Sequence, residues 1–329
     1  MKIFRPAFHH LHTPQLDLSD GLPGFPHLET AARLDGAVDG LARLGLRDTI
    51  DVPDLAKDDV AALHDADYIA FLEALSDSLA ADEAYIPTQF DRRLSEAPIR
   101  VQGGLYCREI GTPINSGTLK AAYNSAATAV QAAQCTAEGN LDSFALCRPP
   151  GHHAGPMRYG GYCFFNNAYL AANVFAGRGQ SVCVLDIDYH LGDGSAEFAD
   201  PQIPYFSIHA NVARSYPFIT PDQSNSVHLI ALPAHVDIRN YLALLEPMMQ
   251  LIAQQAPDVL VVSLGFDLVN DDFIQDEVTA LVAADYRAIG ESVGSFASPV
   301  CCVLEGGYDR GAIASCCEAF FTGLRSVRT

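Results

Sequence analysis

Long apolar runs and basic residues are both scarce in this chain of 329 residues. No stretch approaches the roughly 18 consecutive apolar residues of a membrane-spanning helix, and the amino-terminal MKIFRPAFHH lacks the apolar core of a secretion signal. We therefore expect a soluble, cytoplasmic protein that does not contact membranes. Lysine and arginine number 20 against 40 acidic residues, a formal net charge of −20. This charge argues against nucleic acid as a partner and favours a cationic ligand, although acidity alone is more often a source of solubility.

CxxC pairs are also missing, although the chain has nine cysteines. The number is odd, and several of these cysteines lie in apolar runs. This usage indicates reduced, buried thiols in a cytosol rather than a disulfide framework.

Eight short apolar or β-branched segments are typical of strands, and amphipathic helical patterns separate most of them. The predicted strands are 1–7, 48–53, 143–149, 181–190, 203–210, 226–233, 258–267 and 299–308. The clearest helical patterns are 27–45, 117–134, 239–255 and 279–296. This alternation predicts a single α/β domain, residues 1–329, with an eight-stranded parallel sheet and helices on both faces. The main irregular stretch, residues 85–117, is expected to be a functional or interface element.

Polar clusters follow four of the predicted strands. They read RPPGHHAG, DIDYHLGDG, GFDLVNDD and EGGYD. Ligands of an open parallel sheet bind beyond the carboxyl ends of its strands, so these clusters predict one shared site.

The DIDYHLGDG cluster raises the question of how a buried strand tolerates several carboxylates. If the strand continues through the cluster, Asp186, Asp188 and His190 project to one side, because alternate residues share a face. Unpaired buried charges are costly, so this arrangement predicts a cation. Asp188 and His190, with Asp267 from another strand end, form a set of three protein ligands that leaves an open position, as in catalytic zinc sites. Such an oxygen-rich set also accepts Fe²⁺ or Co²⁺.

Groups that would assist such a metal lie in the other clusters. His152 and His153 follow the RPPG turn, and Asp186 and Asp193 can each orient one imidazole. Tyr308, beside two glycines, can donate a hydrogen bond to a developing oxyanion. The combination predicts a hydrolase that acts on an amide or ester carbonyl.

Other interpretations of these motifs fit less well. An EF-hand needs glycine where Leu191 stands, and a haloacid-dehalogenase-type phosphatase needs a lysine downstream, whereas every lysine lies upstream. A two-metal ureohydrolase needs acids where Gly192 and Val269 stand. Cys163 as a nucleophile is disfavoured, because apolar neighbours raise the pKa of a thiol.

The motifs together resemble the histone deacetylase and acetylpolyamine amidohydrolase family, which has the arginase–deacetylase fold. The similar segments run nearly end to end: HLETAARLDG, LHDADYIAFL, GTPINSGTLKAA, RPPGHHAG, GGYCFFNNA, LDIDYHLGDG, FSIHA, LGFD and LEGGYD. The resemblance implies a zinc-dependent deacylase with Asp188, His190 and Asp267 as metal ligands. It also implies His153 as general base and acid, His152 as its electrostatic partner, and Tyr308 as the group that polarises the carbonyl.

The same resemblance implies further sites. A structural monovalent cation, K⁺, would be held by Asp186, Ser207 and the backbone carbonyls of Asp188, His190 and Ile208. A substrate tunnel would be lined by Tyr162 and Tyr216, with Ile274 at its rim, and Arg33 would lie near the path of acetate release.

Within the family the motifs are most similar to the acetylpolyamine branch, in which the loop matching 85–117 packs across a dimer and narrows the tunnel. Histone-type members carry an aspartate where this chain has Gly111. We therefore expect a homodimer that acts on small cationic acylated amines. An acyl-lysine deacetylase and a non-catalytic acyl-amine binding protein stay open as alternatives. Asp17, Asp20 and Glu109 are candidates for binding a distal ammonium group, although each is more simply explained as a solvated acid.

Overall fold

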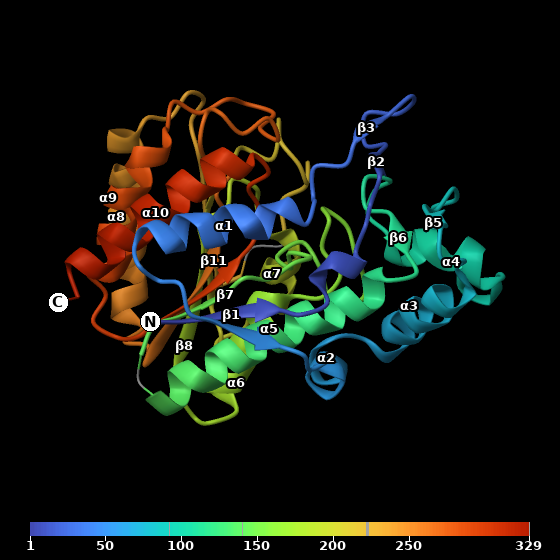
Figure 1. The fold of residues 1–329 in the computed structure, drawn as a ribbon, viewed down its shortest axis with the longest axis horizontal. Helices are drawn as coiled ribbons and strands as arrows, with labels where there is room; N and C mark the ends of the chain where they lie inside the picture. Colours follow the sequence, from blue (N-terminus) through green and yellow to red (C-terminus); the bar gives the residue numbers. More distant parts are fainter. Residues whose placement is uncertain (92, 140, 222–223, 329) are drawn as a thin grey trace.

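The computed structural model describes residues 1–91, 93–139, 141–221 and 224–328. Its centre is an eight-stranded parallel sheet with the strand order β10-β9-β8-β11-β12-β7-β1-β4 (Figure 1). The strands are β1 (Lys2–Pro6), β4 (Thr49–Val52), β7 (Ser143–Ala145), β8 (Val182–Asp186), β9 (Tyr205–His209), β10 (Val227–Ala231), β11 (Val259–Leu264) and β12 (Val300–Leu304). All eight predicted strands and the parallel sheet are confirmed.

The predicted strands are nevertheless too long at their carboxyl ends. The strand expected over 181–190 ends at Asp186, and those expected to reach 149, 267 and 308 end at Ala145, Leu264 and Leu304. The polar clusters therefore lie in the loops that follow the strands. The sequence had suggested that strand alternation gives these side chains a common direction. This interpretation is wrong, because β8 ends at Asp186.

Two layers of helices cover the sheet. One face packs against α5 (Thr118–Gly139) and α6 (Asn167–Ala176), and the other against α1 (Ala32–Arg43), α8 (Ile238–Gln254), α9 (Tyr286–Gly294) and α10 (Arg310–Ser326) (Figure 1). Along β8, Val182 and Val184 join the first core whereas Cys183 and Leu185 join the second, so alternate side chains serve opposite faces.

The predicted helical patterns are all present, with the last one beginning later than expected. The segment 279–296 contains a 3₁₀ turn at Ala283–Asp285 before α9. The remaining helices are α2 (Lys57–Leu63), α3 (Ala66–Ser78), α4 (Ile99–Tyr106) and α7 (Asp193–Phe198), and further 3₁₀ turns cover His9–Leu11 and Leu94–Glu96. Among the helices that the structure describes, none has both the length and the apolar composition needed to cross a membrane.

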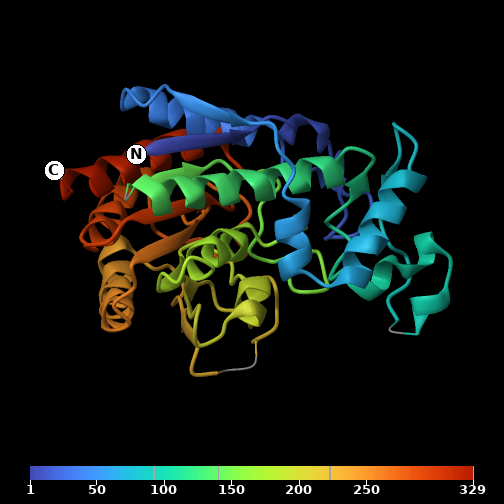
Figure 2. The ribbon, with the colours of Figure 1, turned by 90° about the horizontal axis from the view of Figure 1, so that it is seen from below.

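The segment 85–117 stands to one side of the sheet and is more regular than predicted. It contains α4, and its ends pair as the short strands β5 (Ala84–Tyr85) and β6 (Ile114–Asn115). A second short pair joins β2 (Leu16–Asp17) and β3 (Phe25–Pro26). Figures 1 and 2 show α3, α4, β5 and β6 grouped at the end of the molecule opposite the two termini. This end also borders the loops that carry the polar clusters.

Candidate active site and metal centre

Three buried side chains meet beyond the carboxyl ends of β8 and β11. Nδ1 of His190 lies 3.5 Å from Oδ1 of Asp188 and 3.5 Å from Oδ2 of Asp267. Metal–ligand distances of about 2.0–2.1 Å in a tetrahedral site require ligand atoms about 3.3–3.4 Å apart. Oδ2 of Asp267 is buried and has no hydrogen-bond partner among the described residues. The spacing and the unpaired oxygen both fit a small divalent cation.

Hydrogen bonds within the loop after β8 give these side chains their positions. Oδ1 of Asp186 accepts the N–H of Asp188 at 3.0 Å, and Oδ1 of Asp188 accepts the N–H of His190 at 2.8 Å. Each aspartate thus closes a turn over the residue two positions on, a conformation that aspartate favours. These turns replace the strand alternation that the sequence had suggested.

Two glycines allow the backbone to approach the carboxylates closely. The N–H of Gly306 donates to Oδ2 of Asp188 at 2.7 Å. A Cβ atom at Gly306 or Gly265 would overlap with the oxygens of Asp188 and Asp267. Any larger residue at either position would therefore displace the carboxylates.

The electrostatics of the group also call for a cation. Asp267 is 0% exposed, and this burial, followed by the charge of Asp188, raises the pKa of Asp267 to about 6. Carboxylates packed together in a dry interior are unfavourable unless a positive charge compensates them. A bound divalent ion would supply that charge.

Two adjacent histidines, each paired with a carboxylate, lie next to this group. Nδ1 of His152 is 3.1 Å from Oδ2 of Asp186, and Nδ1 of His153 is 2.7 Å from Oδ1 of Asp193. Because a carboxylate only accepts, each Nδ1 carries a proton, and Nε2 of His153 is left as the free nitrogen of its ring. The structure thus places one aspartate next to each imidazole.

The two histidines have different environments. Burial and then the neighbouring His152 lower the pKa of His153 to about 4. Burial opposes protonation of His152 too, but Asp188 and Asp186 raise its pKa well above the ordinary value. The carboxylate cluster thus favours a proton on His152, whereas His153 is neutral.

Glu305 is a residue of the site that sequence reasoning missed, although it begins the EGGYD cluster. Its Oε2 accepts the N–H groups of Gly151 at 2.7 Å and His152 at 3.1 Å, and Oε1 accepts the hydroxyl of Ser263 at 3.2 Å. Glu305 is fully buried, and burial raises its pKa to about 7. This side chain ties the loop of the two histidines to the end of β12.

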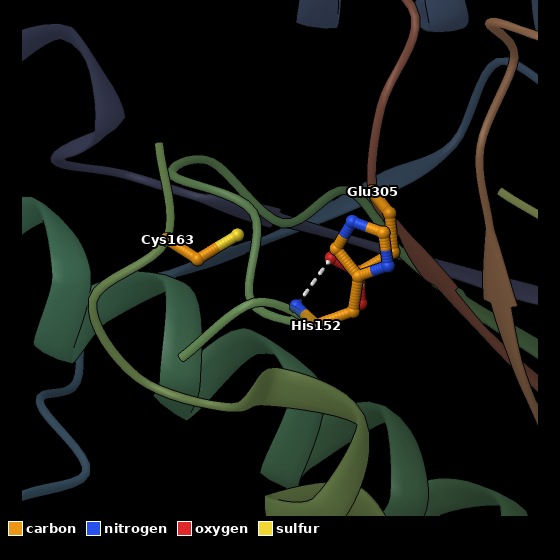
Figure 3. A group of neighbouring side chains, drawn as sticks. All are labelled: His152, Cys163 and Glu305. Atoms are coloured by element: carbon orange, nitrogen blue, oxygen red, sulfur yellow. Dashed lines mark hydrogen bonds between the residues drawn. The ribbon is translucent and has the colours of Figure 1, made fainter. Parts of the chain in front are cut away.

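Figure 3 shows Glu305 with His152 and Cys163, which form a second group of metal-binding residue types. The group is already engaged: Glu305 holds backbone N–H groups and His152 holds Asp186. Burial and the charge of Glu305 raise the pKa of Cys163 well above its ordinary value, so its thiol is protonated and donates to the carbonyl of Gly161 at 3.2 Å. This environment agrees with the rejection of Cys163 as a nucleophile.

Tyr308 is held from two sides. Its N–H donates to Oδ2 of Asp272 at 2.6 Å, and the guanidinium carbon of Arg33 lies 4.7 Å from the centre of its ring. Arg33 is itself buried and donates to Glu29 at 2.9 Å, to the carbonyl of Gly307 at 2.5 Å and to that of Glu305. Arg33 therefore packs against the ring of Tyr308, which is consistent with its predicted place near the site.

Asp272 is the second residue that sequence reasoning missed. It is 2% exposed, and its carboxylate accepts the N–H groups of Tyr308, of Asp309 at 3.3 Å and of Ile274 at 3.2 Å. Asp272 joins the segment after Asp267 to the loop of Tyr308.

A cavity of about 660 Å³ leads to His153, His190 and Tyr308. Tyr216 packs with its ring perpendicular to that of His153, at a centroid distance of 4.8 Å, and the ring of Tyr162 lies 5.6 Å from that of Tyr308. Both predicted tunnel tyrosines and Ile274 line this cavity. The aromatic walls and the candidate metal centre thus belong to one site.

The comparisons with known proteins agree with this geometry. A model of the histone deacetylase domain matches residues 27–324. The chain belongs to the histone deacetylase family. Acetylpolyamine amidohydrolase 1 of Pseudomonas aeruginosa is 32% identical to it over 327 residues, which cover 93% of each chain. Acetylpolyamine amidohydrolase 2 of the same organism is 33% identical over 318 residues, which cover 91% of this chain and 92% of the relative. The crystal structure of an acetylpolyamine aminohydrolase from Burkholderia pseudomallei matches with a TM-score of 0.91 and 27% identity over 99% of both chains. The predicted family and fold are confirmed.

The mouth of this histone deacetylase-family cavity is acidic. Asp17, Asp20, Glu109 and Asp276 line it. Asp17 is not a solvated acid: it is fully buried and accepts the hydroxyl of Tyr162 at 2.5 Å. Glu109 is partly buried and accepts the N–H of Gly161 at 3.0 Å, whereas Asp20 is exposed. The solvated interpretation therefore holds for Asp20 alone among the three acids named from the sequence.

Two further expectations for a family member can be placed in the structure. Asp186 on β8 and Ser207 on β9, whose side chains were named for a monovalent cation, are paired neighbours in the sheet. A side chain at Gly111 would come within 2.8 Å of Asp17 and of Glu109. The aspartate of histone-type relatives therefore has no room here unless these acids move.

Proposed function

We propose that this histone deacetylase-family protein is a zinc-dependent amidohydrolase that removes acetyl groups from small cationic amines such as acetylpolyamines. The observation that carries this proposal is the cavity itself. It joins the Asp188–His190–Asp267 group and the His153–Asp193 pair to tyrosine walls and an acidic mouth. The names of the acetylpolyamine amidohydrolase relatives support the same substrate class.

The charge of the mouth suits a substrate that carries ammonium groups. Four acids line the cavity: Asp20 and Asp276 are exposed, Glu109 is partly buried and Asp17 is buried. Opposite charges at close range attract a distal ammonium, and the net charge of −20 adds long-range steering. Gly111 counts against a protein substrate, because the backbone-binding aspartate of histone-type relatives is missing and would fit only if Asp17 and Glu109 moved.

The chemistry follows from the positions of the side chains. When bound by Asp188, His190 and Asp267, zinc supplies a Lewis acid that activates water and polarises the acyl oxygen. Nε2 of His153 accepts the proton of the attacking water, since Nδ1 is occupied by Asp193, and later delivers it to the leaving amine. The Tyr308 hydroxyl donates to the acyl oxygen as it becomes an oxyanion.

His152 has a supporting role in this proposal. Asp186 fixes its ring through Nδ1, and its Nε2 lies 3.7 Å from Oδ1 of Asp188. The ring centres of His152 and His153 are 4.1 Å apart. A positive or partly positive His152 at this distance keeps the proton affinity of His153 low until the oxyanion forms.

The remaining parts of the proposal concern ions, assembly and compartment. Fe²⁺ or Co²⁺ can replace zinc in this oxygen-rich ligand set, and K⁺ would bind at Asp186 and Ser207. The segment 85–117 contributes Arg108, Glu109, Ile110 and Gly111 to the lining of the cavity. The end of the molecule that contains this segment stands apart from the sheet (Figure 2), which supports a homodimer formed through it. All nine cysteines are free, as expected for a cytoplasmic protein.

Rates on a matched set of substrates test the proposal. Acetylputrescine, acetylcadaverine, acetylspermidine and an acetyl-lysine peptide are compared at equal concentration, with the metal content of the protein measured. We expect kcat/KM to be highest for the acetylated polyamines. Preference for the peptide would favour the acyl-lysine alternative and leave the mechanism in place.

Two variants separate an enzyme from a binding protein. His153→Ala is expected to lower kcat by about 10²–10⁴-fold, and Tyr308→Phe by about 10²–10³-fold, while both retain substrate binding. Arg178→Ala, which removes an exposed ion pair with Glu138, serves as the control for a surface change. Absence of turnover in the parent protein with every acylated amine would favour the non-catalytic alternative.

A further inference from the structure

One positively charged side chain lines a cavity that is otherwise acidic. Among the described residues that line it, Arg108 is the one that carries a guanidinium or ammonium group. A cation at this place works against the binding of a cationic amine. Its charge is directed instead at the protein, because a terminal nitrogen of Arg108 lies 3.1 Å from Oδ2 of Asp193.

Asp193 uses its two oxygens for different partners. Oδ1 accepts from Nδ1 of His153, whereas Oδ2 receives Arg108 and also Arg158 at 2.9 Å. Arg158 is shared with Glu197 at 2.7 Å, so part of its charge is already used. Asp193 is 1% exposed, and a buried carboxylate of this kind is stable only when its charge is paired. Arg108 provides the second of its two ion pairs.

The backbone of Arg108 is attached to the loop that covers His153. The N–H of Arg108 donates to the carbonyl of Tyr159 at 2.9 Å, and the N–H of Tyr159 donates to the carbonyl of Tyr106 at 2.8 Å. A Cβ atom at Gly160 would come within 2.7 Å of Cβ of Arg108, and one at Gly161 would overlap with the ring of His153. The stretch 106–108 is therefore packed directly against the chain that closes over the histidine.

From this geometry we infer that Arg108 is a positioning residue of the reaction: it holds Asp193, and through Asp193 it fixes the ring of His153. Arg108 belongs to the segment 85–117, whose α4 ends at Tyr106, two residues before it. The proton-transfer geometry thus depends on the placement of that protruding segment. This inference rests on the proposed function and extends it.

The second arginine restricts the orientation of the Asp193 carboxylate. With both present, Oδ2 is drawn toward two guanidinium groups, which restricts rotation of the carboxylate about its χ2 angle. Without Arg108, the carboxylate is free to turn toward Arg158, and the 2.7 Å hydrogen bond that Nδ1 of His153 donates to Asp193 lengthens or bends. Misplacement of a catalytic group lowers turnover more than it lowers substrate binding.

The test compares Arg108→Ala and Arg108→Lys in the zinc-loaded protein, with the acetylated amine that the parent protein hydrolyses fastest. We expect kcat of Arg108→Ala to fall about tenfold, with KM within twofold and zinc content unchanged. Arg108→Lys, which retains the charge, should recover kcat to within about threefold of the parent value. Should Arg108→Ala fail to fold, Arg108→Gln is used in its place.

A double-variant cycle separates this role from a structural one. In an Asp193→Asn background, removal of Arg108 should change kcat by less than about twofold, because the carboxylate on which it acts is gone. Arg100→Ala is the matched control, since Arg100 lies in the same segment but pairs with Glu83. An equal loss of kcat in both backgrounds, an equal loss in the control, or a kcat of Arg108→Ala within twofold of the parent value would refute the inference.

A readout independent of turnover keeps the inference separate from the proposed function. The Nδ1–H proton of His153, bonded to a carboxylate, gives a downfield proton resonance that is assigned by its loss in His153→Ala. This resonance should shift or broaden in Arg108→Ala and not in Arg100→Ala, even if no acylated amine is hydrolysed. An unchanged resonance in Arg108→Ala would contradict the role of Arg108.

Discussion

Replacement of Asp272 by alanine tests whether a buried carboxylate places Tyr308. Asp272 accepts three backbone N–H groups, from Tyr308 at 2.6 Å, Ile274 at 3.2 Å and Asp309 at 3.3 Å. Asp309 is also the N-cap of α10, where its side chain accepts the N–H of Ala312 at 2.7 Å. The substitution therefore removes the common acceptor of two segments that meet at the cavity.

The cost in stability can be worked out from these bonds. A hydrogen bond to a charged acceptor contributes about 1.5–3 kcal/mol. Burial raises the pKa of Asp272, which shows that part of its desolvation is not recovered, and so we take the lower end, about 4.5 kcal/mol for three bonds. An unfolding entropy of about 2.1 cal/mol/K per residue gives about 0.7 kcal/mol/K for 329 residues. The expected fall in Tm is therefore about 6 °C.

The cost in activity has an upper limit. If Asp272 acts through Tyr308, Asp272→Ala cannot lower kcat by more than Tyr308→Phe does, about 10²–10³-fold. We expect a loss of about 10–100-fold in kcat with KM changed less than threefold. In the presence of Tyr308→Phe, the further loss from Asp272→Ala should be less than about threefold.

The assay combines steady-state kinetics on an acetylated polyamine with thermal unfolding of the same preparations. Asp271→Ala is the matched control, because Asp271 is the exposed neighbour of Asp272 and carries the same charge. A variant of Asp272 that unfolds about 6 °C earlier but keeps kcat within twofold would show that the carboxylate stabilises the fold without placing Tyr308. A loss of kcat that adds fully to that of Tyr308→Phe would also refute the reasoning.

Three further predictions concern Glu305, a buried histidine and the metal. Because burial raises the pKa of Glu305 to about 7, Glu305→Gln should keep kcat within about threefold, whereas Glu305→Ala should lose about tenfold, both measured with metal content unchanged. His64 donates to the carbonyl of Gly155 and accepts the N–H of Asn166, and burial lowers its pKa to about 4. Its folded-state pKa lies below the unfolded value of about 6.5, so its contribution is complete above pH 6.5 and is lost toward pH 4. Between these limits the free energy of unfolding of His64→Gln should fall by about 1.4 kcal/mol less per pH unit than that of the parent protein in denaturant titrations. Chelation should abolish turnover, and zinc at about 1,000 times its Kd should restore it and raise the stability of the apo-protein by about 4 kcal/mol, measured as a rise in Tm.

The fold could be predicted because its signals are local. Each strand is a short apolar run and each helix has its own periodic face, so the pattern of residues 181–186 or 239–254 is legible without reference to the rest of the chain. The ends of the strands were predicted less well. Ile187 and Tyr189 continue the apolar pattern of β8, but they pack in the core from a turned loop, which a pattern of hydrophobicity cannot distinguish from a strand.

Some residues of the candidate site could also be predicted from the sequence, and others could not. The candidate metal ligands and the two histidines can be recognised from the sequence, because few other roles place carboxylates and imidazoles in a glycine-rich loop after a buried strand. Glu305 and Asp272 do not, since their partners are backbone N–H groups that lie 154 and 36 positions away along the chain. Every residue except proline offers such an N–H, so these contacts leave no trace in residue identity. Arg108 was missed because the carboxylate that it pairs with belongs to a different segment, and only the folded chain brings the two together. The residues proposed to carry the chemistry can therefore be recognised in the sequence, whereas those that hold them in place are visible only in the structure.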